Sequence, residues 1–246
     1  MLSDFTTLTF DCYGTLIDWE KGILGELRPW AIRHGVIATD ETLLDVFAGI
    51  ESVCQQESPT ARYPQILEEV LGRIARRYSV ELDEGEGAEF GRSVGRWPAF
   101  PDSAEALRYL RGRYKLVILS NVDRESFAMS EERLGVTFDR VITAQDVGSY
   151  KPDIRNFKYL LDDLGQSLQV RPEQILHTAQ SLYHDIVPAQ SLGLRTMWIN
   201  RRRGKDGWGA TPKPDGSAEE STPDWEVGNM AEFAALHRSQ TVRTMT

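Results

Sequence analysis

The stretch TLTFDCYGTLID, residues 7–18, decides how the rest of the chain is interpreted. It begins with the apolar run Leu8-Thr9-Phe10, continues with Asp11 and turns at Gly14. A buried strand that ends in a carboxylate and a glycine turn delivers that carboxylate to the C-terminal edge of a sheet, where open α/β sheets bind their ligands. A strand followed by a solvated acidic turn is common, so this stretch alone leaves the role of Asp11 open.

Strand and helix patterns alternate from residue 98 onward. The continuous apolar run at 115–119 predicts a strand that is buried on both faces. A helix is expected to open at Pro152. The alternation predicts a parallel sheet with helices on both faces, to which the first strand, at 6–11, also belongs. The other strands are predicted at 140–143, 174–178, 195–199 and 225–227.

Residues 20–97 carry helical apolar spacing and no strand pattern of any length. They are therefore expected to form a small helical bundle, inserted between the first strand and the rest of the sheet. Residues 203–223 are rich in Gly, Pro, Ser and charged residues and predict a surface loop, and 238–246 predict a loose tail.

Composition narrows the classes of partner. The 246 residues carry a formal net charge of −9, with a pI of about 5.1, which argues against nucleic-acid and anionic-membrane partners. The compact basic run at 201–203 is interpreted as a solvated loop. Two cysteines, Cys12 and Cys54, fit free thiols in a reducing compartment. With neither a secretory signal nor an apolar run of membrane-span length, we expect a soluble cytoplasmic protein.

Chemically useful side chains follow four of the predicted strands. Asp11 follows the first strand, and Ser120 and Asn121 follow the strand at 116–119. Lys151 comes after the strand at 141–143, and Asp185 after the strand at 175–178. Each of these is a weak signal alone, but parallel strands bring their carboxyl ends to one edge, so all of them are expected to converge on one crevice.

The order and spacing of these residues resemble the haloacid dehalogenase superfamily of hydrolases. The resemblance implies that Asp11 is a covalent nucleophile and that Ser120 and Asn121 bind the anionic group of the substrate. It further implies that Lys151 keeps the nucleophile ionised, while Asp185 acts in the hydrolytic step.

The resemblance covers essentially the whole chain and implies its domain organisation. The family has a doubly wound, Rossmann-like parallel sheet core with a helical cap inserted after the first strand. On this sequence the core comprises 1–17 and 98–246, and the cap comprises 18–97. Proteins of this family often dimerise, so a homodimer is one expectation for the oligomeric state.

Two positions distinguish the chemistries of this family. Most members are Mg²⁺ phosphatases with a second Asp two residues after the nucleophile, and here that position is Tyr13. A phenol with a pKa of about 10 is a poor acid for an alkoxide leaving group and a poor base at neutral pH. Phosphatases also usually have an Asp at the position of Gln180, which offers Mg²⁺ only a neutral oxygen.

A dehalogenase needs neither missing acid, because halide leaves as a stable anion. The run at 10–16 also resembles the first motif of the L-2-haloacid dehalogenases, which have tyrosine at the position of Tyr13. The leading hypothesis is therefore metal-independent, cofactor-free hydrolysis of a small anionic 2-haloacid through an ester on Asp11. Tyr13, Thr15 and Gln180 are expected to contact the substrate, and Gln180 is a candidate for orienting the water.

Some features depart from that family pattern. Leu182 stands where the L-2-haloacid dehalogenases have an asparagine, and Phe157 stands where they often have a tyrosine. The expected second cap helix, 40–56, has no arginine to receive halide, and only Arg33 and Arg62 flank it. Two alternatives therefore stay open: a Mg²⁺-dependent phosphatase acting on a small phosphate ester, and a non-catalytic binding protein on the same fold.

Overall fold

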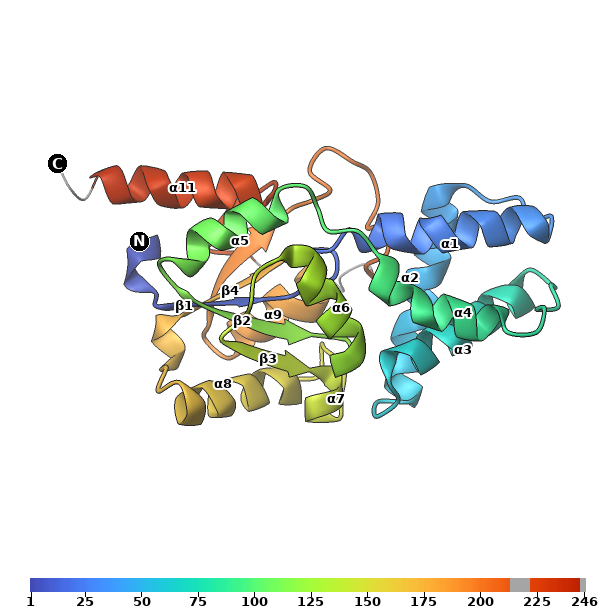
Figure 1. The fold of residues 1–246 in the computed structure, drawn as a ribbon, viewed down its shortest axis with the longest axis horizontal. Helices are drawn as coiled ribbons and strands as arrows, with labels where there is room; N and C mark the ends of the chain where they lie inside the picture. The colour runs from blue at the N-terminus through green and yellow to red at the C-terminus, as the bar shows by residue number, and fades with distance from the viewer. Residues whose placement is uncertain (213–221, 244–246) are drawn as a thin grey trace.

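The computed structural model describes residues 1–212 and 222–243, and its centre is a parallel sheet with strand order β3-β2-β1-β4-β5-β6 (Figure 1). The order reverses direction at β1, which lies between β2 and β4. In a doubly wound sheet this switch point opens a crevice at the carboxyl ends of the strands. The strands are β1 (Thr7–Phe10), β2 (Lys115–Ser120), β3 (Arg140–Thr143), β4 (Ile175–Ala179), β5 (Arg195–Ile199) and β6 (Trp225–Val227).

Helices cover both faces of the sheet, as the α/β prediction requires. Along β2, Leu116 and Ile118 pack in the core beneath α5 and α11, whereas Val117 and Leu119 pack against α8 on the opposite face (Figure 1). This two-sided burial explains the continuous apolar run in the sequence. The core helices are α5 (Ser103–Arg111), α6 (Arg124–Leu134), α7 (Ala144–Val147), α8 (Arg155–Ser167), α9 (Val187–Ser191) and α11 (Met230–Arg243), with short turns η1 (Leu2–Asp4), η3 (Pro172–Gln174) and the π-helical η4 (Leu182–Ile186).

The segment between β1 and α5 is helical and lies beyond the carboxyl ends of the strands (Figure 1). Its apolar stripes are buried, as the helical spacing predicted, in a cluster that continues into one face of the sheet. The division into a core, 1–17 and 98–246, and a cap, 18–97, stays a proposal. Below, the cap means residues 18–97. Its helices are α1 (Trp19–Arg33), α2 (Asp40–Glu57), α3 (Tyr63–Arg77), α4 (Glu86–Arg92) and η2 (Ser93–Arg96).

Two sequence predictions about helix ends were wrong. The helix expected to open at Pro152 begins at Arg155, three residues later. The tail expected at 238–246 is helical as far as Arg243, within α11. There His237 bonds Tyr109 of α5, which ties the last helix to the core. Part of the predicted loop at 203–223 lies outside the described residues.

The basic run at 201–203 is only partly solvated, because Arg203 is half exposed while Arg201 and Arg202 are held in ion pairs. Arg201 forms an ion pair with Asp102 at 2.8 Å. Arg202 is nearly buried and bridges Glu20 and Glu41 of the cap at 2.9 Å each. This arginine therefore fastens the cap to the sheet instead of offering a charge to a partner.

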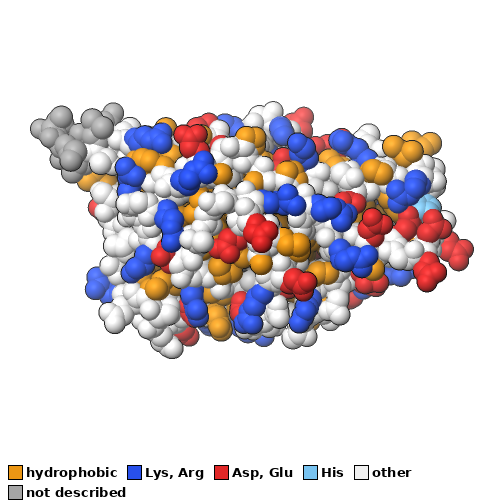
Figure 2. All heavy atoms as spheres, in the orientation of Figure 1, with side chains coloured by type: hydrophobic (Ala, Val, Ile, Leu, Met, Phe, Trp, Pro, Cys, Tyr) orange, Lys and Arg blue, Asp and Glu red, His pale blue; other side chains and the backbone are white. Residues whose placement is uncertain are grey.

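The face drawn in Figure 2 has acidic and basic side chains interspersed over core and cap alike. None of the described helices has the length and apolar character that crossing a membrane would require.

Candidate active site

Asp11 lies directly after β1, at the switch point of the sheet, and is buried. The chain turns sharply behind it at Gly14, whose φ of +93° is a conformation that side-chain-bearing residues avoid. A Cβ at Gly14 would lie 3.0 Å from both Gln180 Oε1 and Trp19 Nε1. The glycine therefore lets the loop close tightly under the cap and keeps the Asp11 carboxylate facing inward.

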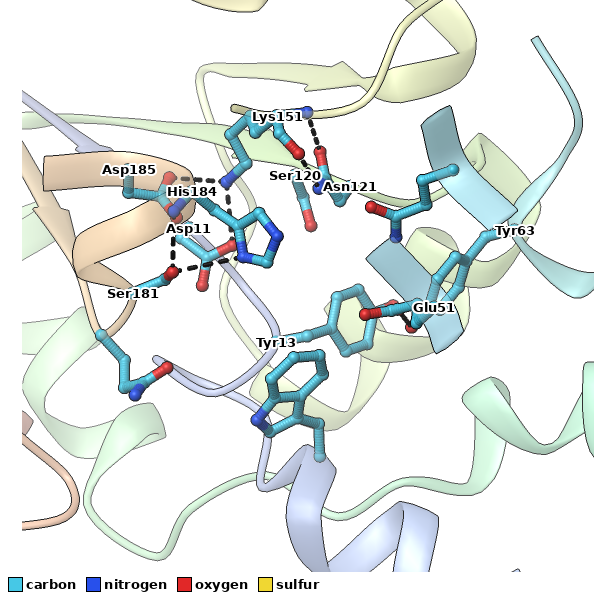
Figure 3. A pocket seen from close by; sticks show the side chains of 13 residues that line it. Asp11, Tyr13, Glu51, Tyr63, Ser120, Asn121, Lys151, Ser181, His184 and Asp185 are labelled. Carbon is cyan, nitrogen blue, oxygen red and sulfur yellow. Dashed lines mark hydrogen bonds and ion pairs between the residues drawn. The ribbon is translucent and has the colours of Figure 1, made fainter. Parts of the chain in front are cut away.

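One lysine joins two acids at this edge (Figure 3). Lys151 Nζ donates to Asp11 Oδ1 at 3.0 Å, to Asp185 Oδ1 at 2.6 Å and to the Leu119 carbonyl at 2.9 Å. All three of its protons are thus used, and its side chain is 1% exposed. The predicted convergence of residues 11, 151 and 185 is present in the structure.

Burial and charge shift the pKa values of the trio in different directions. Burial lowers the pKa of Lys151, but Asp11 and Asp185 outweigh it, so the pKa of the lysine is raised and it stays an ammonium ion. Burial raises the pKa of Asp11, although Lys151 and Thr15 oppose that shift. Burial acts the same way on Asp185, but Lys151 and His177 lower the pKa of that carboxyl overall.

His177 holds Asp185 in place, a role that the sequence did not reveal. Its Nδ1 lies 2.9 Å from Thr9 Oγ1 on the neighbouring strand, and its Nε2 lies 3.1 Å from Asp185 Oδ1. A proton on Nε2 satisfies both contacts, because Thr9 then donates to Nδ1 and the ring donates to Asp185. The other carboxylate oxygen, Asp185 Oδ2, is buried and bonds no described residue, so it can accept a bond from water or substrate.

A small cavity of about 20 Å³ lies between these groups and the cap. Ser120 lines it with a buried Oγ that bonds no described residue. A buried hydroxyl without a partner is unfavourable unless a ligand or water completes it, so Ser120 is free to bond a molecule in the cavity, and its contact with the substrate stays a prediction. The cavity is lined by Asp11, Tyr13, Trp19, Glu51, Gln55, Tyr63, Ser120, Asn121, Lys151, Gln180, Ser181, His184 and Asp185.

Asn121 lies on this cavity, but its side chain is engaged with the backbone of Lys151. Its Nδ2 donates to the Lys151 carbonyl at 3.0 Å, and its Oδ1 accepts from the Lys151 N–H at 2.6 Å. The amide therefore positions the lysine. A direct contact between Asn121 and the substrate stays a prediction.

Thr15 and Gln180 join the loop after β1 to the end of β4. Thr15 Oγ1 donates to Asp11 Oδ2 at 2.7 Å and accepts from the Gln180 N–H at 2.9 Å. The Gln180 side-chain oxygen accepts from Thr211 at 3.1 Å. Thr15 thus orients the carboxylate, while the expected substrate contacts of both residues stay predictions.

Tyr13 lines the cavity with its ring, and its hydroxyl lies 2.9 Å from Ser130 Oγ. Burial raises the pKa of this phenol well above its ordinary value. It therefore stays protonated at neutral pH and cannot alternate as acid and base beside Asp11. Tyr13 therefore cannot replace the second aspartate that the phosphatases of this family have at this position.

The donor set at this edge does not suit Mg²⁺. Asp11 and Asp185 share the Lys151 ammonium, and the Gln180 side-chain oxygen is bonded to Thr211. Mg²⁺ prefers an octahedral set of hard oxygens that includes carboxylates. Within the described ranges, the one group of three potential ligands close enough to share an ion is on the cap, well away from β1: His34, Asp83 and Glu86.

Glu51 is a cavity residue that the sequence interpretation missed. It comes from α2 and is 2% exposed, and its Oε1 accepts a 2.6 Å bond from the Tyr63 hydroxyl. Burial raises the pKa of this carboxyl to about 7, although the bond from Tyr63 opposes the shift. A sequence signal existed, because Glu51 is spaced four residues after Phe47 on the apolar stripe of its helix.

Replacing Glu51 with glutamine is expected to raise the free energy of unfolding at pH 8 by about 3 kcal/mol, at about 1.4 kcal/mol per pKa unit. Between its ordinary pKa of 4.5 and about 7, the folded protein binds a proton that the unfolded chain has released. The wild type therefore loses stability as the pH rises through that window, and the variant does not. Urea unfolding of the wild type and the variant at pH 5 and pH 8 checks this. An equal difference between their free energies of unfolding at the two pH values would contradict it.

Comparisons with known proteins identify the family of the chain. The model of the haloacid dehalogenase-like hydrolase family matches residues 5–193. An (S)-2-haloacid dehalogenase 4A of Burkholderia cepacia is 26% identical over 216 residues, covering 82% of this chain and 86% of its own. A phosphoserine phosphatase of Thermus thermophilus is 28% identical over 211 residues, covering 83% and 76%.

A solved structure supports the fold. The L-2-haloacid dehalogenase of Xanthobacter autotrophicus superimposes with a TM-score of 0.75 at 20% identity, covering 95% of this chain and 98% of its own. That likeness confirms the doubly wound, Rossmann-like sheet with inserted helices. Since the family model matches most of the chain and the strand-end residues of its motifs converge as the resemblance implied, the chain belongs to the haloacid dehalogenase-like hydrolases.

Proposed function

We propose that this hydrolase cleaves the carbon–halogen bond of a small 2-haloacid without a metal or cofactor, through an ester on Asp11. The observation that carries the proposal is a paired nucleophile whose neighbour two residues on, Tyr13, cannot serve as the second acid that an alkoxide leaving group needs. Asp11 is held by Lys151 and Thr15, while the Tyr13 hydroxyl is bonded to Ser130. Halide needs no such acid. Relatives named as (S)-2-haloacid dehalogenases support this choice.

In the first step, a carboxylate oxygen of Asp11 attacks the carbon that bears the halogen. The new C–O bond forms as the C–X bond breaks, and halide leaves with the electron pair. The unpartnered Ser120 Oγ is placed to donate to the carboxylate of the substrate. Lys151 keeps the nucleophile anionic, because its ammonium ion lies 3.0 Å from Asp11 Oδ1.

In the second step, water attacks the carbonyl carbon of the Asp11 ester. Asp185 Oδ2 bonds no described residue and is our candidate for accepting a proton from that water. Lys151 offsets the negative charge that develops on the Asp11 oxygen. The bond between the ester carbonyl and the alkyl oxygen breaks, and that oxygen takes the proton held by Asp185. The hydroxyacid then departs, and Asp11 retains one oxygen of the water.

The size of the cavity limits the substrate. About 20 Å³ is room for little more than one water molecule. A second cavity of about 260 Å³ shares Gln55 and Lys151 with the first and is bounded by α2 and the loop at 149–155. We propose that a substrate of a few carbon atoms reaches Asp11 through this second cavity, with an outward shift of the cap.

A single turnover in ¹⁸O-labelled water tests the covalent route. With enzyme in excess over a 2-haloacid, we expect label in the Asp11 carboxylate, seen as a 2 Da increase in the peptide that contains it. The hydroxyacid from this first turnover should carry unlabelled oxygen, since its new hydroxyl comes from Asp11. Label in the first-turnover product, with Asp11 unlabelled, would mean direct attack by water and would refute the ester.

A phosphatase is the second candidate, because a phosphoserine phosphatase is among the relatives of similar identity. Phosphate release that requires Mg²⁺ and stops with chelator would favour it, whereas halide release unaffected by chelator favours the dehalogenase. The cytoplasmic location, the homodimer and the absence of nucleic-acid partners stay predictions.

A further inference from the structure

The cap places an acid opposite the nucleophile. In Figure 3, Asp11 lies on one side of the cavity and Glu51 enters from the other, next to Tyr13. An SN2 displacement sends the leaving group away from the attacking oxygen, on the side opposite the nucleophile. A halide displaced by Asp11 would therefore move toward Glu51.

An acid at the position of Glu51 is unexpected, because the cavity already holds two other carboxylates and has to receive an anion. Asp11 and Asp185 share the one permanently cationic side chain of the lining, Lys151. None of the described arginines lines the cavity, and Arg33 and Arg62, the candidates from the sequence, are both exposed. An ionised Glu51 would repel an arriving anion at short range in a water-poor site. A neutral carboxyl would instead offer it an O–H donor.

We propose that Glu51, in its protonated form, donates a hydrogen bond to the departing halide and so does the work of the absent cap arginine. The inference rests on the dehalogenase function proposed above. As the C–X bond breaks, the electron pair goes to the halogen and the proton stays on Glu51. The proton produced by the whole reaction leaves with the second step, when water is split between Asp11 and the product.

The contact from Tyr63 leaves one carboxyl oxygen for this purpose. The hydroxyl of Tyr63 donates to Oε1 at 2.6 Å, so a proton on Oε2 can face an anion. A pKa of about 7 lets Glu51 be neutral near physiological pH, and a neighbouring anion favours the neutral form further.

Other titratable groups near Glu51 do not change charge between pH 6 and pH 8. Burial raises the pKa values of Tyr13, Tyr63 and Tyr150 above 10, and burial also raises that of Cys54 from 9.0, so these groups stay protonated. Across the cavity, burial lowers the pKa of His184 to about 4, so it stays neutral. Burial also raises the pKa of Asp11, so a proton taken up with halide in this range belongs to Glu51 or to Asp11, and its loss in Glu51→Gln assigns it to Glu51.

Calorimetric titration with sodium bromide tests the inference without relying on turnover. Ionic strength is held constant with sodium gluconate, and two buffers of different ionisation enthalpy report protons taken up. Because only the neutral form binds, bromide affinity should be about tenfold weaker at pH 8 than at pH 6. Near pH 8 the wild type should take up close to one proton per bromide bound.

Three variants separate a specific role from a general one. Glu51→Gln keeps a donor and should bind bromide with no pH dependence and no proton uptake. Tyr63→Phe removes a bond that lowers the pKa of Glu51, so it should move the midpoint of the pH dependence upward. Glu57→Gln, a matched loss of charge at an exposed position of α2, should behave as the wild type does.

The outcomes distinguish this inference from the proposed function. Equal bromide affinity at pH 6 and pH 8 without proton uptake would overturn the role of Glu51, even if haloacids are hydrolysed. Bromide binding with the expected proton uptake would support the anion site, even if no 2-haloacid is turned over. In that second case the single-turnover experiment with 2-haloacids would refute the dehalogenase function, while the anion site would remain.

Discussion

Replacing Lys151 with methionine is expected to lower the free energy of unfolding by about 3–5 kcal/mol, because it leaves buried carboxylates without their cation. Methionine has nearly the length of lysine, so the loss reflects charge and hydrogen bonds more than volume. The ammonium ion donates to Asp11, Asp185 and the Leu119 carbonyl, and nothing else in the lining carries a permanent positive charge. Turnover should fall by about 10²–10³-fold or more, the size of effect seen when a preorganised charge is removed.

The pH dependence identifies the cause of that loss. Without the ammonium ion, the pKa values of Asp11 and Asp185 should rise, and the variant should recover stability as the pH falls and the carboxyls are protonated. Urea unfolding at pH 5 and pH 8 should therefore show a smaller difference in the free energy of unfolding between wild type and variant at pH 5. Lys158→Met, at an exposed position of α8, is the matched control and should stay within about 0.5 kcal/mol. A small gap that does not vary with pH would contradict the buried trio.

The sheet and its catalytic edge were predictable because they depend on local patterns. Strands buried on both faces need continuous apolar runs, as in β2. The predicted bounds of β3 and β5 also match the observed ones. Parallel topology then brings the residue after each strand to one edge, so the meeting of Asp11 with Lys151 and Asp185 followed from order alone.

Other parts of the site depend on contacts that no local pattern encodes. Glu51 faces the cavity only because α2 folds back over the sheet edge, and Thr9 fixes the ring of His177 only because β4 pairs with β1. Arg202 looked like part of a solvated basic run, but its partners Glu20 and Glu41 are more than 150 residues away. The last turns of α11 were missed because α5 and the N-terminal turn stabilise them, through His237 and Gln240.

Replacing Asp185 with asparagine is expected to separate the two chemical steps. Steady-state turnover should fall by about 10²–10⁴-fold, the usual contribution of a general base. Alkylation needs only Asp11 and its neighbours, and an asparagine Oδ1 can still accept from Lys151 and His177. Halide release in the first turnover should therefore persist in Asp185→Asn, and the ester on Asp11 should accumulate.

Rapid-quench halide measurement and intact mass spectrometry check this prediction together. The variant should release close to one halide per site and gain the mass of the carboxyalkyl group of the substrate on the peptide that contains Asp11. Asp11→Asn is the matched control, because it removes one carboxylate from the same trio and should show neither burst nor adduct.

A fast first turnover with no adduct would require another group to activate the water, and His184, which faces the same cavity, would be the residue to replace next. No burst at all would show that Asp185 is needed for the attack itself. In that case the charge balance of the trio, and not the activation of water, would be the reason for an acid at this position.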